Sequence, residues 1–250
     1  MDEQRLDRQL RIEGWNQQAL DRSSVGVIAD NDISHFFNAS AASLGINKIR
    51  GIIERNRTGI DTSLIARCIN PGLDLQTLPS LCVNKAQYHY LDNPSILVDL
   101  NGFAMSKKMS LEWLFDNSAK GLLVLVRNGN FRMYGYEKGR ENDIIREVLP
   151  QNQLPQPYQV DPILSVIGSG LILEEVKNRT MDIPFSSEVI EYSSCTTALK
   201  KEYGNKRILM IGAGALGNFV GLSLALLGVD SVEVIDPDTI EQANLNRQIL

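Results

Sequence analysis

The chain contains 250 residues, of which 43% are hydrophobic and 22% are charged, and its formal net charge at pH 7 is −5. This amount of apolar sequence predicts a globular protein with one large hydrophobic core or two smaller ones. The acidic balance argues against a nucleic-acid-binding protein, which needs a basic surface, so we expect a small molecule or a protein as partner and no nucleic acid.

Helical and strand-like segments alternate along the chain. Residues 3–22 predict an amphipathic helix that is broken near Gly14, because leucines and a tryptophan recur on a charged background. A short buried strand is expected at residues 25–29, and residues 161–182 have a helix-compatible apolar pattern. Further strands are predicted at residues 95–100, 121–126 and 131–137, the last two joined by the hairpin sequence RNGN at residues 127–130.

Residues 207–236 carry the most informative pattern. A strand leads into Gly212, Gly214 and Gly217 in GxGxxG spacing, and an apolar helix and a second strand ending in Asp236 follow. In a nucleotide-binding crossover the first glycine makes the tight turn, the second lets the backbone approach phosphate, and the third lets the helix lie close to the sheet. A carboxylate about 20 residues further on accepts hydrogen bonds from the ribose. Asp236 is placed for that role, and the alternative is a glycine-rich turn without a ligand.

The same pattern occurs earlier in the chain without its glycines. Residues 25–53 align without a gap with residues 208–236, a shift of 183 positions that superposes several identical residues. The three glycines then face Ala29, Asn31 and Ser34. The earlier turn also contains Asp30 and Asp32, whose charges would repel phosphate. We therefore predict two similar domains, of which the first has kept the fold and lost the nucleotide site.

Three motifs in this order resemble the ThiF/MoeB/ubiquitin-activating enzyme superfamily. They are the N-terminal RLDRQLRI, the glycine turn, and the run DPDTIEQANLNRQIL that follows the second strand. The resemblance implies an α/β fold of the Rossmann-like ThiF type, a mostly parallel sheet with helices on both faces, followed by the start of a second copy. Residues 1–195 would form a degenerate adenylation domain that does not bind ATP. Residues 196–250 would form the N-terminal part of a second, ATP-binding domain that is incomplete.

The resemblance also implies an activity and a set of site residues. Family members use ATP and Mg²⁺ to adenylate the C-terminal carboxylate of a ubiquitin-like or sulfur-carrier protein. The residues that this mapping gives to ATP are Gly212, Gly214, Gly217, Asp236, Asn244 and Arg247. Arg8 matches an arginine that reaches the ATP phosphates from the partner domain, so Arg8 and Arg247 are the catalytic candidates. No metal ligand is assigned, because the DxxD pair that would begin at Asp99 has Gly102 in its second position.

Other interpretations of these residues stay open. Arg8 can be a solvated helix charge, and Arg247 can pair with Asp238 or Glu241. The chain can also be a non-catalytic scaffold subunit that supplies Arg8 and a docking surface to an active partner. An NAD- or FAD-dependent oxidoreductase would explain the glycines and Asp236 but gives no role to NLNRQ. Because the chain stops before the lysine and the metal-binding aspartate of active members, we expect a remainder that completes the second domain. It can be a further domain of a longer parent chain or a partner subunit, and the sequence can also be a truncated piece.

Cysteine usage and the lack of an apolar targeting segment predict a cytoplasmic protein. Cys68, Cys82 and Cys195 form no CxxC pair, which is typical of buried thiols in a reducing compartment. The N-terminal residues lack the apolar core of a signal peptide, and no apolar run approaches the roughly 18 residues of a membrane span. We therefore expect no membrane partner.

Overall fold

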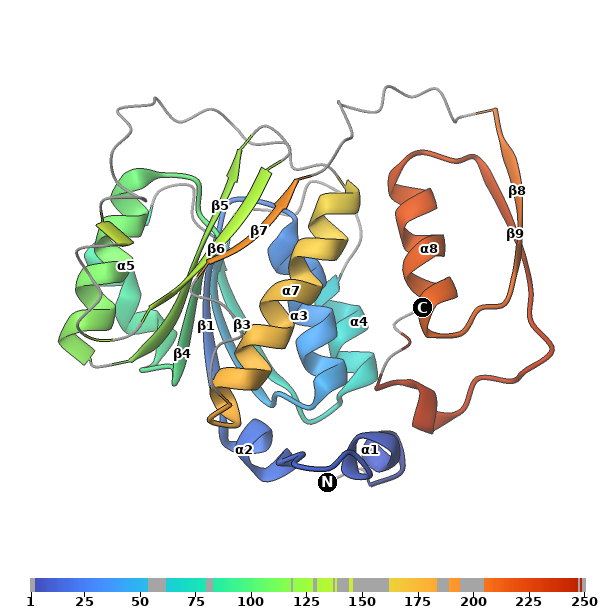
Figure 1. The fold of residues 1–250 in the computed structure, drawn as a ribbon, viewed down its shortest axis with the longest axis horizontal. Coiled ribbons are helices and arrows are strands. Elements are labelled where there is room, and N and C mark those ends of the chain that lie inside the picture. The colour runs from blue at the N-terminus through green and yellow to red at the C-terminus, as the bar shows by residue number, and fades with distance from the viewer. Residues whose placement is uncertain are drawn as a thin grey trace.

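The structure is a computed structural model, and it contains two sheets, one of seven strands and one of two strands (Figure 1). It describes residues 3–53, 62–79, 83–117, 119–127, 130–136, 138, 144–145, 162–183, 189–193, 205–246 and 248. The first sheet and its helices comprise α1 (Glu3–Leu10), α2 (Gln17–Arg22), β1 (Ser24–Ala29), α3 (Ile33–Leu44), β2 (Lys48–Ile53), α4 (Thr62–Ile69), β3 (Asp74–Pro79), the 3-10 helix η1 (Lys85–Leu91), β4 (Ile96–Asp99), α5 (Ala104–Asn117), β5 (Lys120–Arg127), β6 (Asn130–Tyr136), α7 (Pro162–Thr180) and β7 (Val189–Ser193). The second comprises β8 (Arg207–Ile211), α8 (Ala215–Leu226), β9 (Ser231–Ile235) and the 3-10 helix η2 (Gln242–Asn244).

The large sheet is mostly parallel, which confirms the predicted fold class. Its strand order is β3-β2-β1-β4-β5-β6-β7, and among its described strands only the pairs β5–β6 and β6–β7 are antiparallel. The predicted strands and the long helix over residues 161–182 are confirmed, and the predicted N-terminal helix is two helices separated by Gly14, which has φ +78°. The strand order reverses between β1 and β4. In doubly wound sheets ligands bind at this reversal, beyond the carboxyl ends of the strands.

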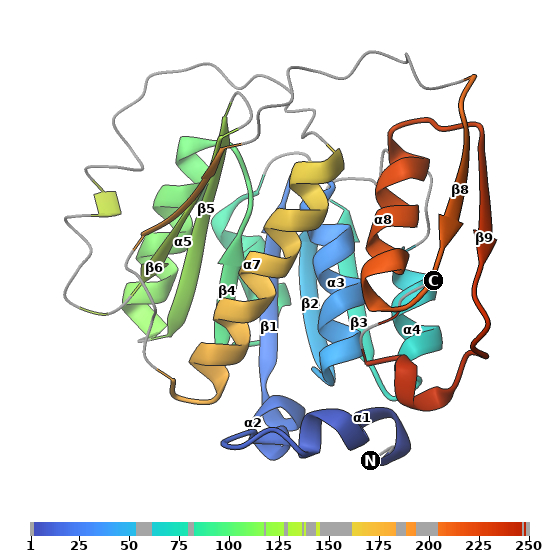
Figure 2. The same cartoon turned by 45° about the vertical axis from the view of Figure 1, so that its right-hand side comes forward.

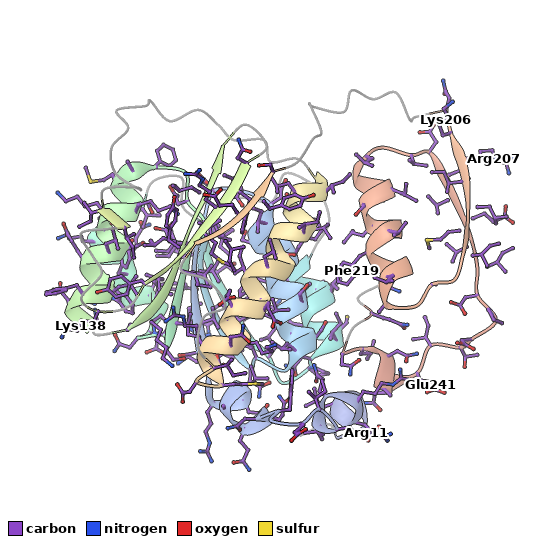
Figure 3. All side chains as sticks on the ribbon, in the orientation of Figure 1. Arg11, Lys138, Lys206, Arg207, Phe219 and Glu241 are labelled. Atoms are coloured by element: carbon purple, nitrogen blue, oxygen red, sulfur yellow. The ribbon has the colours of Figure 1, made fainter. Side chains whose placement is uncertain are left out.

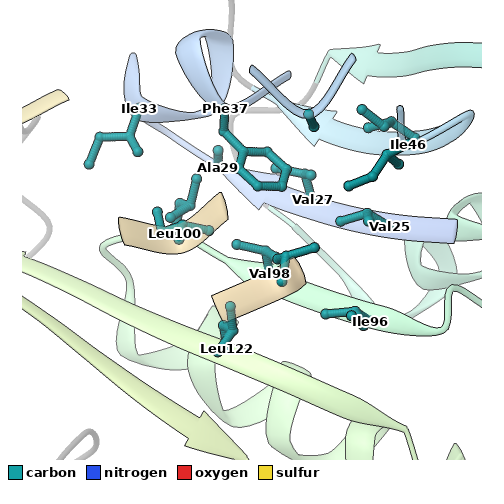
Figure 4. Packing of buried hydrophobic residues seen from close by; sticks show 14 of the residues in the cluster. Val25, Val27, Ala29, Ile33, Phe37, Ile46, Ile96, Val98, Leu100 and Leu122 are labelled. Carbon is teal, nitrogen blue, oxygen red and sulfur yellow. The ribbon is translucent and has the colours of Figure 1, made fainter. Parts of the chain in front are cut away.

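Helices cover both faces of the large sheet, so its central strands are apolar on both sides. On one face, Val27 of β1 lies in the same buried cluster as Phe37 of α3, together with residues of α7 (Figure 4). On the other face, Ile28 clusters with Leu97 of β4 and Leu114 of α5. Each such side chain contributes roughly 1.5–3 kcal/mol when fully buried. This two-sided core explains why residues 25–29 form an unbroken apolar run.

The internal repeat extends to the pairing of the strands. Val25 of β1 pairs with Ile49 of β2, and Ile208 of β8 pairs with Val232 of β9, again in parallel. Both residues of the second pair lie 183 positions after those of the first pair. The helix between the strands ends in both copies at a glycine in the left-handed region, Gly45 with φ +100° and Gly228 with φ +78°. The two crossovers therefore share one backbone plan.

The second sheet lies beside the first, with α8 between them (Figure 2). Leu222 of α8 is buried in a small apolar cluster with Phe36 of α3 and Ile69 of α4, and Phe219 packs against this cluster from α8 (Figure 3). The first helix, α1, contacts η2 (Figures 1 and 2). None of the described helices has the length and apolar character that a bilayer crossing requires.

Candidate functional site

The glycine turn between β8 and α8 uses each of its three glycines for a different reason. Gly212 has φ +94°, and its N–H donates to the carbonyl oxygen of Ile235 on the neighbouring strand at 2.8 Å. A Cβ atom on Gly217 would collide with the carbonyl oxygen of Gly212, so this glycine lets the helix start close to the turn. A Cβ atom on Gly214 would meet no atom within 4 Å. The backbone at Gly214 is therefore open to a ligand.

Substituting Gly217 with alanine is expected to destabilise the second sheet by about 1–3 kcal/mol, because the added methyl group forces the helix away from the turn. Gly221 is the matched control, since its Cβ atom would meet only the flexible end of Met210 at 3.6 Å. Gly221→Ala is expected to be neutral or stabilising by up to about 1 kcal/mol, because alanine favours helix. Calorimetric unfolding of both variants checks this, and equal effects would contradict the close approach.

Asp236 follows β9 and is hydrogen-bonded to the glycine turn. Its Oδ2 atom accepts from the Ala213 N–H at 2.5 Å, and its Oδ1 atom accepts from the Asp238 N–H at 2.8 Å. These two bonds lower the pKa of the Asp236 carboxyl below its usual value. The carboxylate is therefore ionised at neutral pH, and each oxygen keeps a second lone pair for a ligand.

Asn218 is a part of this site that sequence reasoning missed. It lies in the first turns of α8, is buried, and donates from Nδ2 to the carbonyl oxygens of Ala213 at 2.6 Å and Gly214 at 3.2 Å. Asparagine is unfavourable inside helices unless its side chain bonds to the backbone. An asparagine in an otherwise apolar helix was the available signal.

The other predicted site residues are Arg8, Asn244 and Arg247. The structure brings the elements that carry the first two into contact and does not describe the third. Arg8 is exposed on α1, and α1 contacts η2, which ends at Asn244. Leu245 from the same NLNRQ run packs against the apolar cluster that joins α8 to α3 and α4. Arg247 lies outside the described residues, so its predicted role and its alternative ion pairs stay predictions.

The equivalent turn of the first copy is closed by its own side chains. Asp30 accepts from the Gly102 N–H at 2.9 Å, which links the turn after β1 to the turn after β4. Asn31, which stands at the position of Gly214, donates from Nδ2 to the Leu100 carbonyl at 2.7 Å and to Asp30 at 3.2 Å. Side chains of the protein thus tie this turn to the turn after β4 at the strand reversal.

A buried ion pair lies next to this closed turn. Lys107 and Asp99 are both fully buried, and Lys107 Nζ donates to Asp99 Oδ1 at 2.8 Å and to its carbonyl oxygen at 2.6 Å. Ser110 donates to the other carboxylate oxygen at 2.6 Å, and the Ser110 hydroxyl also bonds to the Tyr88 hydroxyl at 2.8 Å. Burial lowers the pKa of Lys107, while the carboxylate of Asp99 opposes this effect. Asp99 Oδ1 also accepts from the Asn101 N–H at 2.8 Å, and Oδ2 from the Ser106 hydroxyl at 3.5 Å, so that each oxygen has two donors.

The first copy should also respond to pH through Asp30. Burial raises the pKa of the Asp30 carboxyl above its ordinary value of 3.8. The folded state therefore holds this proton more tightly than the unfolded state does, and stability falls as pH rises from 3.8 through the folded pKa. The Asp30→Asn variant keeps an acceptor for the Gly102 N–H and has no carboxyl group to ionise, so its stability should not fall as the pH rises. Urea unfolding from pH 4 to pH 8 checks the difference between the two proteins.

Comparison with known proteins places these features in a family. Residues 185–250 match the model of the ThiF family, and this range contains the glycine turn, Asp236 and the NLNRQ run. The adenylyltransferase and sulfurtransferase UBA4 of Candida albicans is 33% identical over 86 residues, 34% of this chain and 18% of that protein. Residues 185–250 are therefore similar to the ThiF family and to adenylyltransferases and activating enzymes.

Other ThiF relatives agree with this placement. The NEDD8-activating enzyme E1 catalytic subunit of Caenorhabditis elegans is 56% identical over 46 residues, 18% of this chain and 11% of that protein. The chain thus spans less than a fifth of the length of these curated relatives. Escherichia coli MccB, crystallised with AMPCPP and MccA, superposes with a TM-score of 0.56 at 13% identity, over 71% of this chain and 62% of MccB. That superposition supports the ThiF-type fold.

Proposed function

We propose that this chain belongs to an activating enzyme that uses ATP to adenylate the C-terminal carboxylate of a ubiquitin-like or sulfur-carrier protein. The observation that carries the proposal is the open glycine turn at the start of α8, with nothing within 4 Å of a Cβ on Gly214, in a chain whose residues 185–250 match the ThiF family. The relatives named above include an adenylyltransferase and a NEDD8-activating enzyme.

In this proposal the second copy binds ATP. Gly212, Gly214 and Gly217 shape a turn whose backbone N–H groups face the phosphates, helped by the positive end of the α8 dipole. Asp236 accepts hydrogen bonds from the ribose hydroxyls through the lone pairs that Ala213 and Asp238 leave free.

The reaction requires positive charge, because one anion attacks another. A carboxylate oxygen of the carrier protein forms a bond to the α-phosphorus, and the bond from this phosphorus to the oxygen of pyrophosphate breaks. Asn244 and Arg247 in the NLNRQ run would contact the phosphates, and Arg8 would reach them from the first copy. The contact between α1 and η2 supports this role for Arg8. Such cations act by stabilising charge in the transition state.

The two copies would then have different tasks. Residues 1–195 form the domain that cannot bind ATP, in agreement with the turn closed by Asp30 and Asn31. Residues 196–250 form the start of the ATP-binding domain. In the described part of the chain β8 pairs only with β9, whereas the equivalent β1 lies between β2 and β4.

A partner domain or subunit would complete the small sheet. Leu209, Ile211 and Ile235 are 56%, 79% and 51% exposed on it. Large apolar side chains gathered in this way mark a surface that packs against another element.

Mg²⁺ would enter with the ATP phosphates. The described residues contain no group of three or more carboxylate, histidine or cysteine side chains that could hold a metal ion. Each carboxylate oxygen of Asp99 already accepts from two donors within the protein, which leaves no free position for a metal ion. We therefore assign no metal ligand in this chain.

A non-catalytic scaffold subunit is the second candidate, favoured by the closed site of the first copy. It would supply Arg8 and a docking surface to an active partner. The oxidoreductase interpretation is weaker, because it leaves NLNRQ without a role and the sequence relatives are adenylyltransferases and activating enzymes.

ATP–pyrophosphate exchange in the presence of a candidate carrier protein separates these functions. Exchange by this chain with a completing partner, lost on Arg8→Ala, is the expected result. Exchange by this chain alone would exclude the scaffold interpretation. Binding of NAD without binding of ATP would overturn the proposal of an activating enzyme.

A further inference from the structure

We propose that Asn218 is a positioning residue for the nucleotide: it holds the carbonyl groups of the glycine turn inward, so that the N–H groups of Gly214 and Ala215 face outward toward phosphate. The inference rests on the proposed ATP site, and it names a residue that no family motif quoted above includes. Asn218 does not touch the ligand and acts only through the turn.

The side chain of Asn218 is committed to two backbone carbonyls. It is 5% exposed, and Nδ2 donates to Ala213 at 2.6 Å and to Gly214 at 3.2 Å. The backbone N–H of Asn218 donates to the same Gly214 carbonyl at 2.9 Å, as in a regular helix. Two consecutive carbonyl groups at the start of α8 are therefore fixed from the helix side.

The orientation of the N–H groups follows from peptide geometry. In a trans peptide unit the C=O and N–H bonds point in opposite directions across a rigid plane. Fixing the Ala213 carbonyl toward Asn218 therefore aims the Gly214 N–H away from the helix, and fixing the Gly214 carbonyl aims the Ala215 N–H the same way. These N–H groups stand at the helix start, where an intrahelical acceptor does not exist. They are donors for an anion.

Ala213, the residue before Gly214, is fixed at its N–H group as well. The Ala213 N–H donates to Asp236 at 2.5 Å, so both polar groups of Ala213 have partners within the protein. At Gly214 the outer face of the turn stays open. A turn held in this way loses little freedom when phosphate binds, and such preorganisation increases affinity.

The first copy shows the opposite arrangement. Its turn is held by Asn31, whose side chain lies in the turn itself and bonds to the Leu100 carbonyl at 2.7 Å and to the Ile33 N–H at 3.2 Å. Asn31 stands at the position of Gly214, and the position of Asn218 is taken by His35. In the first copy, the Asn31 side chain lies in the turn and closes it. In the second copy, the Asn218 side chain bonds to the turn from the helix side and leaves the outer face at Gly214 open.

Two variants of Asn218 and one control test this role. Asn218→Leu keeps the approximate size and removes both donors, whereas Asn218→Ser keeps a donor that can reach only the carbonyl four residues before it. Ser223 shows that geometry in the same helix, because its hydroxyl donates to the Phe219 carbonyl at 2.8 Å. Ser223→Ala removes that comparable bond far from the turn and is the control.

We expect Asn218→Leu to weaken ATP binding about tenfold to a hundredfold, since it frees the turn and leaves the partly buried Ala213 carbonyl without a donor. Asn218→Ser should fall between this variant and the wild type, and Ser223→Ala should bind within about twofold of the wild type. The affinity for adenosine, which lacks phosphate, should fall by no more than about twofold in any variant, because in this proposal the turn contacts only the phosphates. Titration calorimetry measures ATP, and competition measures adenosine.

Hydrogen exchange separates this inference from the proposed function. Without nucleotide, Asn218→Leu should speed amide exchange by about tenfold or more at Gly212 and Ala213, whose N–H groups are bonded to Ile235 and Asp236, while Ser223→Ala leaves it unchanged. Unchanged exchange, or unchanged ATP affinity in Asn218→Leu, would overturn the positioning role and leave the ATP site standing. A wild-type chain with its completing partner that binds no ATP would overturn the proposed function, and the exchange result would still decide whether Asn218 fixes the turn.

Discussion

Lys107→Met is expected to destabilise the large sheet by about 3–5 kcal/mol, one of the largest effects of any single substitution in this chain. The change removes the only cation that pairs with Asp99 among the described residues, and it leaves a carboxylate that is 0% exposed without a counter-charge. Urea unfolding followed by the fluorescence of Trp113 measures this effect, because Trp113 packs against the same cluster as Leu114 and Tyr88.

Lys108 supplies the control for this measurement. It is the next residue of α5 and is exposed, so Lys108→Met should change stability by no more than about 0.5 kcal/mol. The double variant Lys107→Met with Asp99→Leu should be less destabilised than the sum of the single changes, by about 1 kcal/mol or more, because it removes the unpaired charge. Equal effects at Lys107 and Lys108 would show that the ion pair does not hold α5 to the sheet.

Gly214→Asp is expected to reduce ATP affinity more than about a hundredfold, because it places a carboxylate where the proposal locates phosphate. The backbone accepts the change, since Gly214 has φ −63° and a Cβ atom there meets nothing within 4 Å. Gly214→Asn has the same shape without the charge and should lose clearly less affinity. Titration calorimetry with ATP, together with circular dichroism to check folding, measures both variants.

The first copy provides a second comparison. Asp30→Ala with Asp32→Ala should leave ATP affinity unchanged within about twofold, because this turn is closed by bonds to Gly102 and Leu100. The same variant should lose about 1–3 kcal/mol of stability, since the partly buried Gly102 N–H loses its acceptor. If ATP affinity fell equally in this variant and in Gly214→Asp, the first copy would bind nucleotide after all.

Helices and strands whose apolar residues recur with a regular period could be predicted from the sequence. A helix that buries a charged residue and exposes apolar ones could not. Strand β1 and helix α7 were located because their apolar residues follow the period of a strand or a helix. Helix α5 was missed, because Lys107 is fully buried in it while Met105 and Phe115 are 64% and 52% exposed. A buried lysine gives no apolar signal, and its burial is possible only because Asp99 reaches it from β4.

For the candidate site, the sequence by itself determined the glycine turn, Asp236 and the repeat that relates the two copies. Spacing carries this information, because a turn with positive φ and a close helix start restricts the residue type locally at Gly212 and Gly217. It also indicated which copy had lost its glycines. The similarity of residues 185–250 to the ThiF family rests on the same local motifs.

Only the tertiary structure decided what replaces the glycines and what holds them. The bond between Asp30 and Gly102 spans 72 positions, and the contact between α1 and η2 joins the two ends of the chain. Asn218 is close in sequence to Ala213, yet its role depends on which way a buried amide points. Such contacts arise from the packing of β1 beside β4 and of α8 on α3 and α4, and a one-dimensional pattern does not contain that packing.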